Sequence, residues 1–124
     1  MFSDLIGKKF AYHGRGPEEY DCYGLAIEVA RRVGIDFPSH PSYTSIHEKH
    51  EAITEGVKNW KRLDSPELYS LVVFSIRPPY VGHVGIVLEY GRFLHISPHT
   101  DVTIERYDKD PWKNKVRGFY QWQG

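Results

Sequence analysis

The stretch from His83 to Ser97, HVGIVLEYGRFLHIS, contains the clearest hairpin signal in the sequence. Two runs rich in β-branched and aromatic residues flank Glu89-Tyr90-Gly91, and a loop of this kind, with glycine in the left-handed position, commonly joins antiparallel strands. The loop pairs Leu88 with Arg92, which fixes the register of the whole hairpin. This stretch therefore predicts an antiparallel sheet.

The register brings two histidines together. His83 lies opposite Ser97 and His95 lies opposite Gly85, and steps of two residues along a strand keep side chains on one face. His83 and His95 are therefore expected on the same face as diagonal neighbours, within reach of each other. Gly85 leaves room on this face for another element to approach. A two-residue turn would instead place the imidazoles on opposite faces.

The rest of the second half continues the β pattern, with short runs of strand-forming residues between turn signals. We expect strands at 69–76, 83–90, 92–97, 102–107 and 116–122. Their close spacing favours antiparallel pairing. Because helical periodicity precedes these runs, the sequence predicts an α+β fold in which a helix covers one face of the sheet.

The first half of the chain contains two candidate helices. Apolar residues recur at helical spacing over 22–33, which predicts an amphipathic helix. Asp21 is a good N-cap for it, and Gly34 is a good C-terminal stop. A second helix is expected at 45–60, although Gly56 weakens its pattern.

The composition excludes several classes of protein. The chain has 124 residues, 40% of them hydrophobic, which suits one compact domain spanning residues 1–124. Basic and acidic side chains number 16 each, so no net charge favours a nucleic-acid partner. No run of about 18 apolar residues occurs, so we expect no membrane insertion.

Cys22 is the single cysteine and opens the predicted first helix. A lone cysteine is most often a small buried hydrophobe. If the helix begins beside the histidine face, its dipole and an imidazolium would lower the thiol pKa from about 8.5 to between roughly 3.5 and 7.5. Cys22 would then be a nucleophile, His83 would move the proton, and His95 would orient His83. Backbone N–H groups at Cys22 and Tyr23 would stabilise an oxyanion.

Three motifs in this order resemble the NlpC/P60 family of papain-like cysteine peptidases, which cut peptide stems in bacterial cell walls. They are DCYGLAIEVARRVGI, GHVGIVLEYGRFLHIS and VRGFYQW. In that family the nucleophile lies in an Asp-Cys-Ser-Gly-like motif, the base opens a His-Val-Gly-Ile-like strand, and a third polar residue, often histidine, ends the next strand. The resemblance implies Cys22, His83 and His95 as catalytic residues. It also implies a papain-like fold with N-terminal helices packed on an antiparallel sheet of five to six strands.

The resemblance runs from FAYHGRGPEEYDC to Trp122 and is closest to a compact phage tail-associated branch of the family. In that branch an aromatic residue follows the cysteine and a Gly-Arg-Gly-Pro-like stretch precedes it, as Tyr23 and 14–17 do here. By the wider family pattern, Tyr12 and Asp21 contact substrate, and Tyr23 reshapes the pocket wall. Asp21 is equally well explained as an N-cap contributing roughly 1 kcal/mol, and Tyr12 as a packed aromatic residue.

The remaining histidines favour plain structural readings. His13, His40, His47, His50 and His99 are expected to be solvated, since they fall in loops or on a polar helix. Zinc is a second possibility for the cysteine and histidines, but the chain has neither CxxC nor HExxH spacing. We therefore expect no metal and no cofactor.

The resemblance implies hydrolysis of peptidoglycan stem peptides through a thioester, between D-glutamate and the diamino acid. Two alternatives stay open: a tail-tip or assembly module that uses a peptidase fold for binding, and a related thiol acyltransferase or amidase. The start of the sequence, MFSDLIGKKF, lacks a secretory apolar run. We therefore expect synthesis in the cytoplasm and transport on a phage tail or similar injection device.

Overall fold

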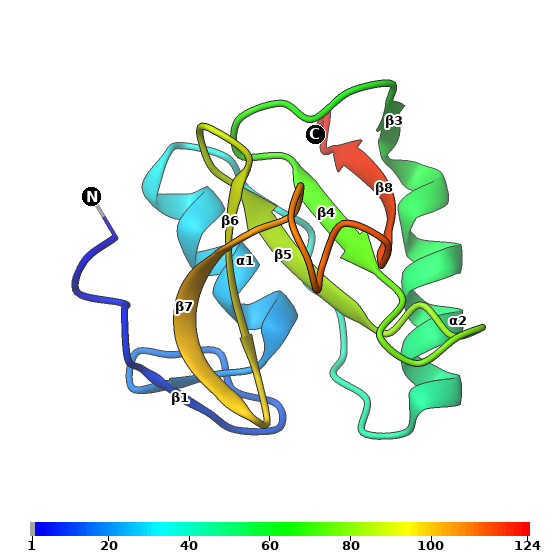
Figure 1. Ribbon diagram of the computed structural model, residues 1–124. Helices are drawn as coiled ribbons and strands as arrows, with labels where there is room; N and C mark the ends of the chain where they lie inside the picture. Colours follow the sequence, from blue (N-terminus) through cyan, green and yellow to red (C-terminus); the bar gives the residue numbers. More distant parts are fainter. Residues whose placement is uncertain (1) are drawn as a thin grey trace.

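A computed structural model describes residues 2–124 as two N-terminal helices followed by an antiparallel sheet (Figure 1). Met1, the first residue of the predicted 1–124 domain, lies outside the described residues. In chain order the elements are β1 (Lys9–Phe10), β2 (Glu19–Tyr20), α1 (Cys22–Arg32), α2 (Ile46–Gly56), the 3₁₀ helix η1 (Val57–Asn59), β3 (Lys61–Leu63), β4 (Leu71–Phe74), β5 (His83–Val87), β6 (Arg92–Ser97), β7 (Thr100–Arg106) and β8 (Val116–Gln121).

The main sheet has six strands in the order β3-β8-β4-β5-β6-β7, and every pair in it is antiparallel. The predicted α+β class and antiparallel sheet are confirmed. The short strand β3 was not expected, because 61–63 is too short and too polar to give a strand pattern. Strands β1 and β2 form a separate parallel pair.

The predicted hairpin register is confirmed. Ile86 pairs with Leu94, and the Leu88 N–H donates to the Arg92 carbonyl at 2.8 Å. The turn itself differs from the expectation, because Tyr90 (φ 61°) is left-handed as well as Gly91 (φ 75°). Two consecutive left-handed residues suit the right-handed twist of hairpin strands, so the turn changes without shifting the register.

Helix α1 begins and ends as its caps predict. The Asp21 carboxylate accepts a hydrogen bond from the Gly24 N–H at 2.7 Å, and Gly34 takes a left-handed conformation (φ 84°) directly after the helix. The buried side of α1 packs against β5 and β6. Its fully buried members are Leu25, Ala26, Val29 and Ala30.

The predicted second helix is split into α2 and η1. Ser45 caps its start, and the α-helix ends at Gly56, where the pattern was weak. No residue of α2 is fully buried. In Figure 1 this helix stands beside the sheet, away from α1. Within residues 2–124 no helix combines the length and apolar character needed to cross a membrane.

Side chains alternate between two faces of the central strands, and both faces are buried. We call the side packed by α1 the helix face; it carries Leu71, Val73, Val84, Ile86, Leu94 and Ile96. We call the opposite side the Trp112 face; it carries Val72, Phe74, Val87 and Phe93, with Trp112 from the β7–β8 connection packed on them. The central strands are therefore covered from both sides, although the sheet is antiparallel.

Candidate active site

His83 and His95 lie together on the Trp112 face. The Nε2 atom of His83 is 2.9 Å from Nδ1 of His95, and the two residues are 5% and 1% exposed. The Trp112 ring stacks on His83 at 24° and contacts His95 edge-on. The predicted proximity of the two histidines is confirmed, whereas their catalytic roles stay predictions.

The space beside Gly85 is used differently from the expectation. A side chain at this position would meet the ring of Phe93 at 2.8 Å and the Cβ of His95 at 3.3 Å. The helix does not approach this face, since α1 packs on the other side of β5, against Val84 and Ile86. The condition set for a low thiol pKa, that α1 packs on the histidine face, is not met, because the ring of Phe93 fills the room that Gly85 leaves.

Cys22 lies at the start of α1 and is half-buried. The backbone N–H groups of Val84 and Tyr23 lie close enough to its sulfur to lower the thiol pKa. Because Val84 follows His83, the thiol and the first histidine meet at the same end of β5 from opposite sides of the sheet. Within residues 2–124 no direct hydrogen bond joins this sulfur to the His83 ring, and catalytic contacts are often longer before substrate binds.

Burial sets the resting charges of this pair. It raises the pKa of the Cys22 thiol, and the Asp21 carboxylate adds to the rise against the Val84 N–H and the charge of Lys49. Burial also lowers the pKa of His83 to about 3, with His95 and Lys49 acting in the same direction. Thiol and imidazole are therefore both neutral near neutral pH. The predicted low thiol pKa is wrong, since desolvation outweighs the helix dipole and no imidazolium is present.

Two further polar residues on the Trp112 face, Glu105 and Trp112, were not predicted from the sequence. Glu105 of β7 lies 2.6 Å through Oε2 from Nε2 of His95, and its Oε1 accepts the Trp112 indole N–H at 3.0 Å. Burial lowers the pKa of His95, and Glu105 opposes that effect. The alternation of side chains along β7 indicates which residues of this strand share a face with Glu105. The partner of Glu105 on β6 depends on the β6–β7 register, which the sequence does not give.

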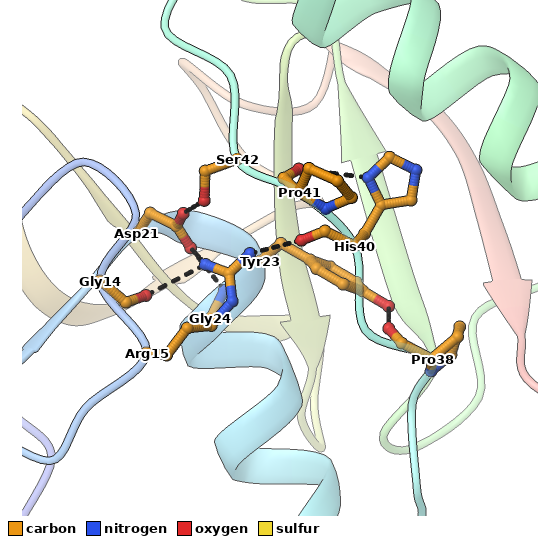
Figure 2. A network of polar contacts seen from close by, with 9 residues as sticks. All are labelled: Gly14, Arg15, Asp21, Tyr23, Gly24, Pro38, His40, Pro41 and Ser42. Carbon is orange, nitrogen blue, oxygen red and sulfur yellow. Dashed lines mark hydrogen bonds and ion pairs between the residues drawn. The ribbon is translucent and has the colours of Figure 1, made fainter.

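Asp21 is held by three donors at the start of α1 (Figure 2). Its Oδ1 accepts from the Gly24 N–H and from Arg15, while Oδ2 accepts from the Ser42 hydroxyl. The side chain is largely buried, with 8% of the residue exposed. The N-cap interpretation of Asp21 is confirmed, and its predicted contact with substrate is not tested by these contacts.

The segment 38–42, which we call the strap, is tied to the same helix start. Arg15 donates to the His40 carbonyl at 2.7 Å, and the Tyr23 hydroxyl donates to the Pro38 carbonyl at 2.6 Å. Figure 2 shows the strap passing beside the first turn of α1 with these side chains between them. Burial raises the pKa of Tyr23, so its hydroxyl stays a donor. Tyr23, the residue after Cys22, thus connects the start of α1 to the strap.

A cavity of about 370 Å³ opens beside the thiol. Cys22 and all three predicted substrate residues line it, with Tyr12 half exposed at 51%. The remaining wall is mostly apolar and includes Phe10, Ile53, Val57, Trp60, Leu71 and Trp122. His83 and His95 are not among the lining residues. Cys22 therefore faces the cavity, and the histidine pair lies on the other side of β5.

The other histidines only partly follow the expectation of solvation. His13, His47 and His99 are exposed. His40 is half-buried against Tyr23, and His50 is half-buried because its Nδ1 accepts the Val81 N–H at 2.8 Å. The expectation was wrong for His40 and His50, since the His40 ring packs against Tyr23 and the loop before β5 folds over His50. Within residues 2–124 no three His, Cys, Asp or Glu side chains are grouped to hold a metal ion.

Residues 7–121 match the NlpC/P60 family. No curated protein matches the chain. A Staphylococcus aureus protein described as similar to a lipoprotein of the NLP/P60 family has a TM-score of 0.68 at 21% identity, over 96% of this chain and 38% of that one. NlpC1 from Trichomonas vaginalis has a TM-score of 0.71 at 20% identity, over 97% of this chain and 41% of that one.

The NlpC/p60 domain of the peptidoglycan hydrolase SagA is also similar, with a TM-score of 0.64 at 19% identity, over 96% of this chain and 91% of that one. At these identities the likeness concerns the fold. The chain spans 38% and 41% of the Staphylococcus and Trichomonas proteins but nearly the whole SagA domain. The papain-like fold predicted from the motifs is therefore confirmed.

Proposed function

The chain belongs to the NlpC/P60 family, and on this premise we propose that it is a cysteine peptidase that hydrolyses peptide bonds in peptidoglycan stem peptides. The carrying observation is the proximity of the Cys22 sulfur to the backbone N–H of Val84, one residue from the buried His83–His95 pair. The likeness to the SagA peptidoglycan hydrolase domain supports the choice of substrate.

Cys22 attacks the carbonyl carbon of the scissile bond, and the thiol proton passes to Nδ1 of His83, the ring nitrogen that does not face His95. His83 then donates this proton to the leaving amine as the C–N bond breaks, which leaves a thioester. Water attacks the thioester with His83 as base, and the free acid and the thiol are restored. Backbone N–H groups at the start of α1 stabilise the oxyanion in both steps.

The resting charges determine when the proton moves. Because the pKa of Cys22 is raised and that of His83 is lowered, the resting site holds a thiol beside a neutral base. Proton transfer therefore accompanies the attack on the carbonyl, unlike in sites that store a thiolate–imidazolium pair. Deprotonation of the thiol is therefore part of the activation barrier for attack on the carbonyl.

The bond cleaved is the one between D-glutamate and the diamino acid, as the family resemblance implies. Tyr12, Asp21 and Tyr23 contact the peptide from the cavity wall. The second finer proposal is that a phage tail or similar injection device carries the chain to the cell wall. The support for it comes from Tyr23 and the GRGP stretch at 14–17, which resemble that branch of the family.

The test is mass spectrometry of muropeptides incubated with the purified protein. The wild-type protein is expected to produce new stem fragments whose masses identify the bond. Cys22→Ala and His83→Ala should abolish them, whereas the exposed His99→Ala control should leave them unchanged. Intact muropeptides with wild-type protein, over a range of stem compositions, would overturn the peptidase proposal.

A thiol acyltransferase acting on an apolar acyl group is the second candidate. The observation in its favour is the largely aromatic and aliphatic wall of the cavity beside Cys22, with Trp60 and Trp122 among its members. The same thioester would then be passed to an amine or alcohol instead of water. Trapping of an acylated Cys22 from a long-chain acyl thioester, without any muropeptide cleavage, would favour this function over the first.

A further inference from the structure

We propose that Glu105, held by Trp112, is a positioning residue that fixes the tautomers of His95 and His83 and so leaves Nδ1 of His83 free to take a proton. The catalytic meaning of this arrangement rests on the proposed function of Cys22 and His83. The hydrogen-bond order itself does not, because it follows from the geometry of the Trp112 face.

Glu105 closes a chain of polar contacts that crosses three strands. It pairs with Phe93 in the β6–β7 ladder, so its side chain lies on the same face as Phe93 and His95. From β7 to β5 the contacts run from Glu105 Oε2 to His95 Nε2 at 2.6 Å, and from His95 Nδ1 to His83 Nε2 at 2.9 Å. The two imidazoles are almost fully buried, so water has little access to their ring nitrogens.

The direction of the hydrogen bonds is set at the Glu105 end. The indole N–H of Trp112 is a donor only, and it reaches Oε1 of Glu105 at 3.0 Å. A carboxylate has acceptors only, so Oε2 must receive a hydrogen from Nε2 of His95. His95 is therefore protonated on Nε2.

The same logic carries across to His83. A neutral His95 with its hydrogen on Nε2 has a bare Nδ1, and that nitrogen can only accept. It accepts from Nε2 of His83, which leaves Nδ1 of His83 bare. A bare Nδ1 is the state that a general base requires. The opposite order would place a hydrogen on Nδ1 of His83 and direct the lone pair of His95 Nε2 at a carboxylate oxygen.

His95 alone cannot make this choice. A neutral imidazole can donate from either nitrogen, so a pair of buried histidines has two internally consistent hydrogen-bond orders. Only a terminal group with acceptors and no donors selects one order. In residues 2–124 that group is Glu105, and the Trp112 indole occupies its second oxygen.

Glu105→Gln tests the proposal because it keeps the shape and supplies a donor. The Trp112 N–H selects the amide oxygen, so the amide NH₂ group points at Nε2 of His95. His95 must then accept there, and the order reverses along the chain to Nδ1 of His83. Activity is expected to fall by about 10²- to 10⁴-fold, as when another hydrolase base is held in the wrong tautomer.

Trp112→Phe supplies the matched control. In the single variant Glu105 still accepts from His95, so the hydrogen-bond order is kept, and any loss of activity in this variant measures the lost packing of the indole on His83. In the double variant the glutamine amide is free to rotate and present its oxygen to His95. The double variant should therefore regain at least about tenfold over Glu105→Gln, a rescue that a purely structural role of Glu105 does not produce.

Nitrogen-15 NMR of the histidine side chains separates this proposal from the proposed function. In the wild-type protein we expect hydrogens on Nε2 of both His83 and His95, and in Glu105→Gln on Nδ1 of both. A wild-type spectrum with a hydrogen on Nδ1 of His83, or an unchanged order in Glu105→Gln, would overturn the proposal. The expected order in a protein without peptidase activity would sink the peptidase function and leave the tautomer assignment standing.

Discussion

The two faces of the sheet hold the two halves of the candidate site in opposite surroundings. On the helix face, Cys22 borders a cavity of about 370 Å³ with an apolar wall. On the Trp112 face, His83 and His95 are almost fully buried. Their ring nitrogens contact each other and Glu105. Under the proposed function, the thiol has to meet substrate, whereas the histidine that moves the proton needs dry surroundings and a fixed orientation. β5 lies between the two environments, and the Cys22 thiol and the His83 imidazole both lie near its first residues.

Opening the buried face should have the largest effect. Phe93→Ala removes a fully buried ring that packs against Phe74, His95 and Trp112. We expect a loss of about 3–5 kcal/mol in the free energy of unfolding, measured by urea titration. Ile104→Ala on β7 is the control, because its side chain is 38% exposed and should cost much less. Equal losses for the two variants would contradict the contrast between a sealed core and the outer surface.

Acid should destabilise the Trp112 face through His83. Its pKa is about 3 in the folded protein against 6.5 ordinarily, so below about pH 6.5 the unfolded chain binds a proton that the folded chain does not. Stability is therefore complete above that pH and falls as the pH drops toward 3. Between about pH 7 and 4.5 this one group removes about 2.5 kcal/mol. In His83→Gln the free energy of unfolding, measured by urea titration at each pH, should fall less steeply as the pH drops. An equally steep fall would contradict the low pKa of His83.

On the helix face, the approach of the 11–20 loop to α1 should be the weak point. A Cβ on Gly24 would lie 2.2 Å from the Gly14 carbonyl oxygen, which is backbone and cannot rotate away. Gly24→Ala should cost about 1–3 kcal/mol in thermal or urea unfolding. Gly56→Ala is the matched control, because only the His40 ring lies near its Cβ, at 3.9 Å, and alanine favours the helix. A neutral Gly24→Ala would show that the loop is free to move.

The smallest effect concerns the thiol alone. Because burial raises the pKa of Cys22, little thiolate exists near neutral pH. The rate of alkylation by iodoacetamide should rise about tenfold per pH unit between about pH 6 and 8, as the thiolate fraction grows. A rate that stays level over this range would instead indicate a stored thiolate–imidazolium pair. His83→Gln measured in parallel reports whether the imidazole contributes to this reactivity.

The sequence predicted the parts of the site that depend on local signals. The loop at 89–91 set the register that places His83 beside His95, and Asp21 and Gly34 marked the ends of α1. These signals lie within a few residues of the elements they define. The family motifs then connected Cys22 to the histidines without any packing argument.

The parts that could not be predicted depend on contacts between distant segments. The face of β5 that α1 covers is not encoded in either element alone, so the role of Gly85 was misjudged. The β6–β7 ladder shifts register between His95 and Ser97, which hides the contact of Glu105 from any count along the chain. Trp112 reaches the same site from a connection that carries no regular pattern.

The β7–β8 connection, which carries Trp112, has a bearing on protein engineering. Surface connections between strands usually tolerate inserted tags, loops or new chain ends. Here the connection lies over the Trp112 face, and its indole both stacks on His83 and holds one oxygen of Glu105. An insertion that displaces this segment would leave the thiol and its cavity intact. It would remove the Trp112 contact that orders the hydrogen bonds of Glu105, His95 and His83. The hairpin turn at Tyr90, which is 80% exposed, is the better place for a fusion or a label.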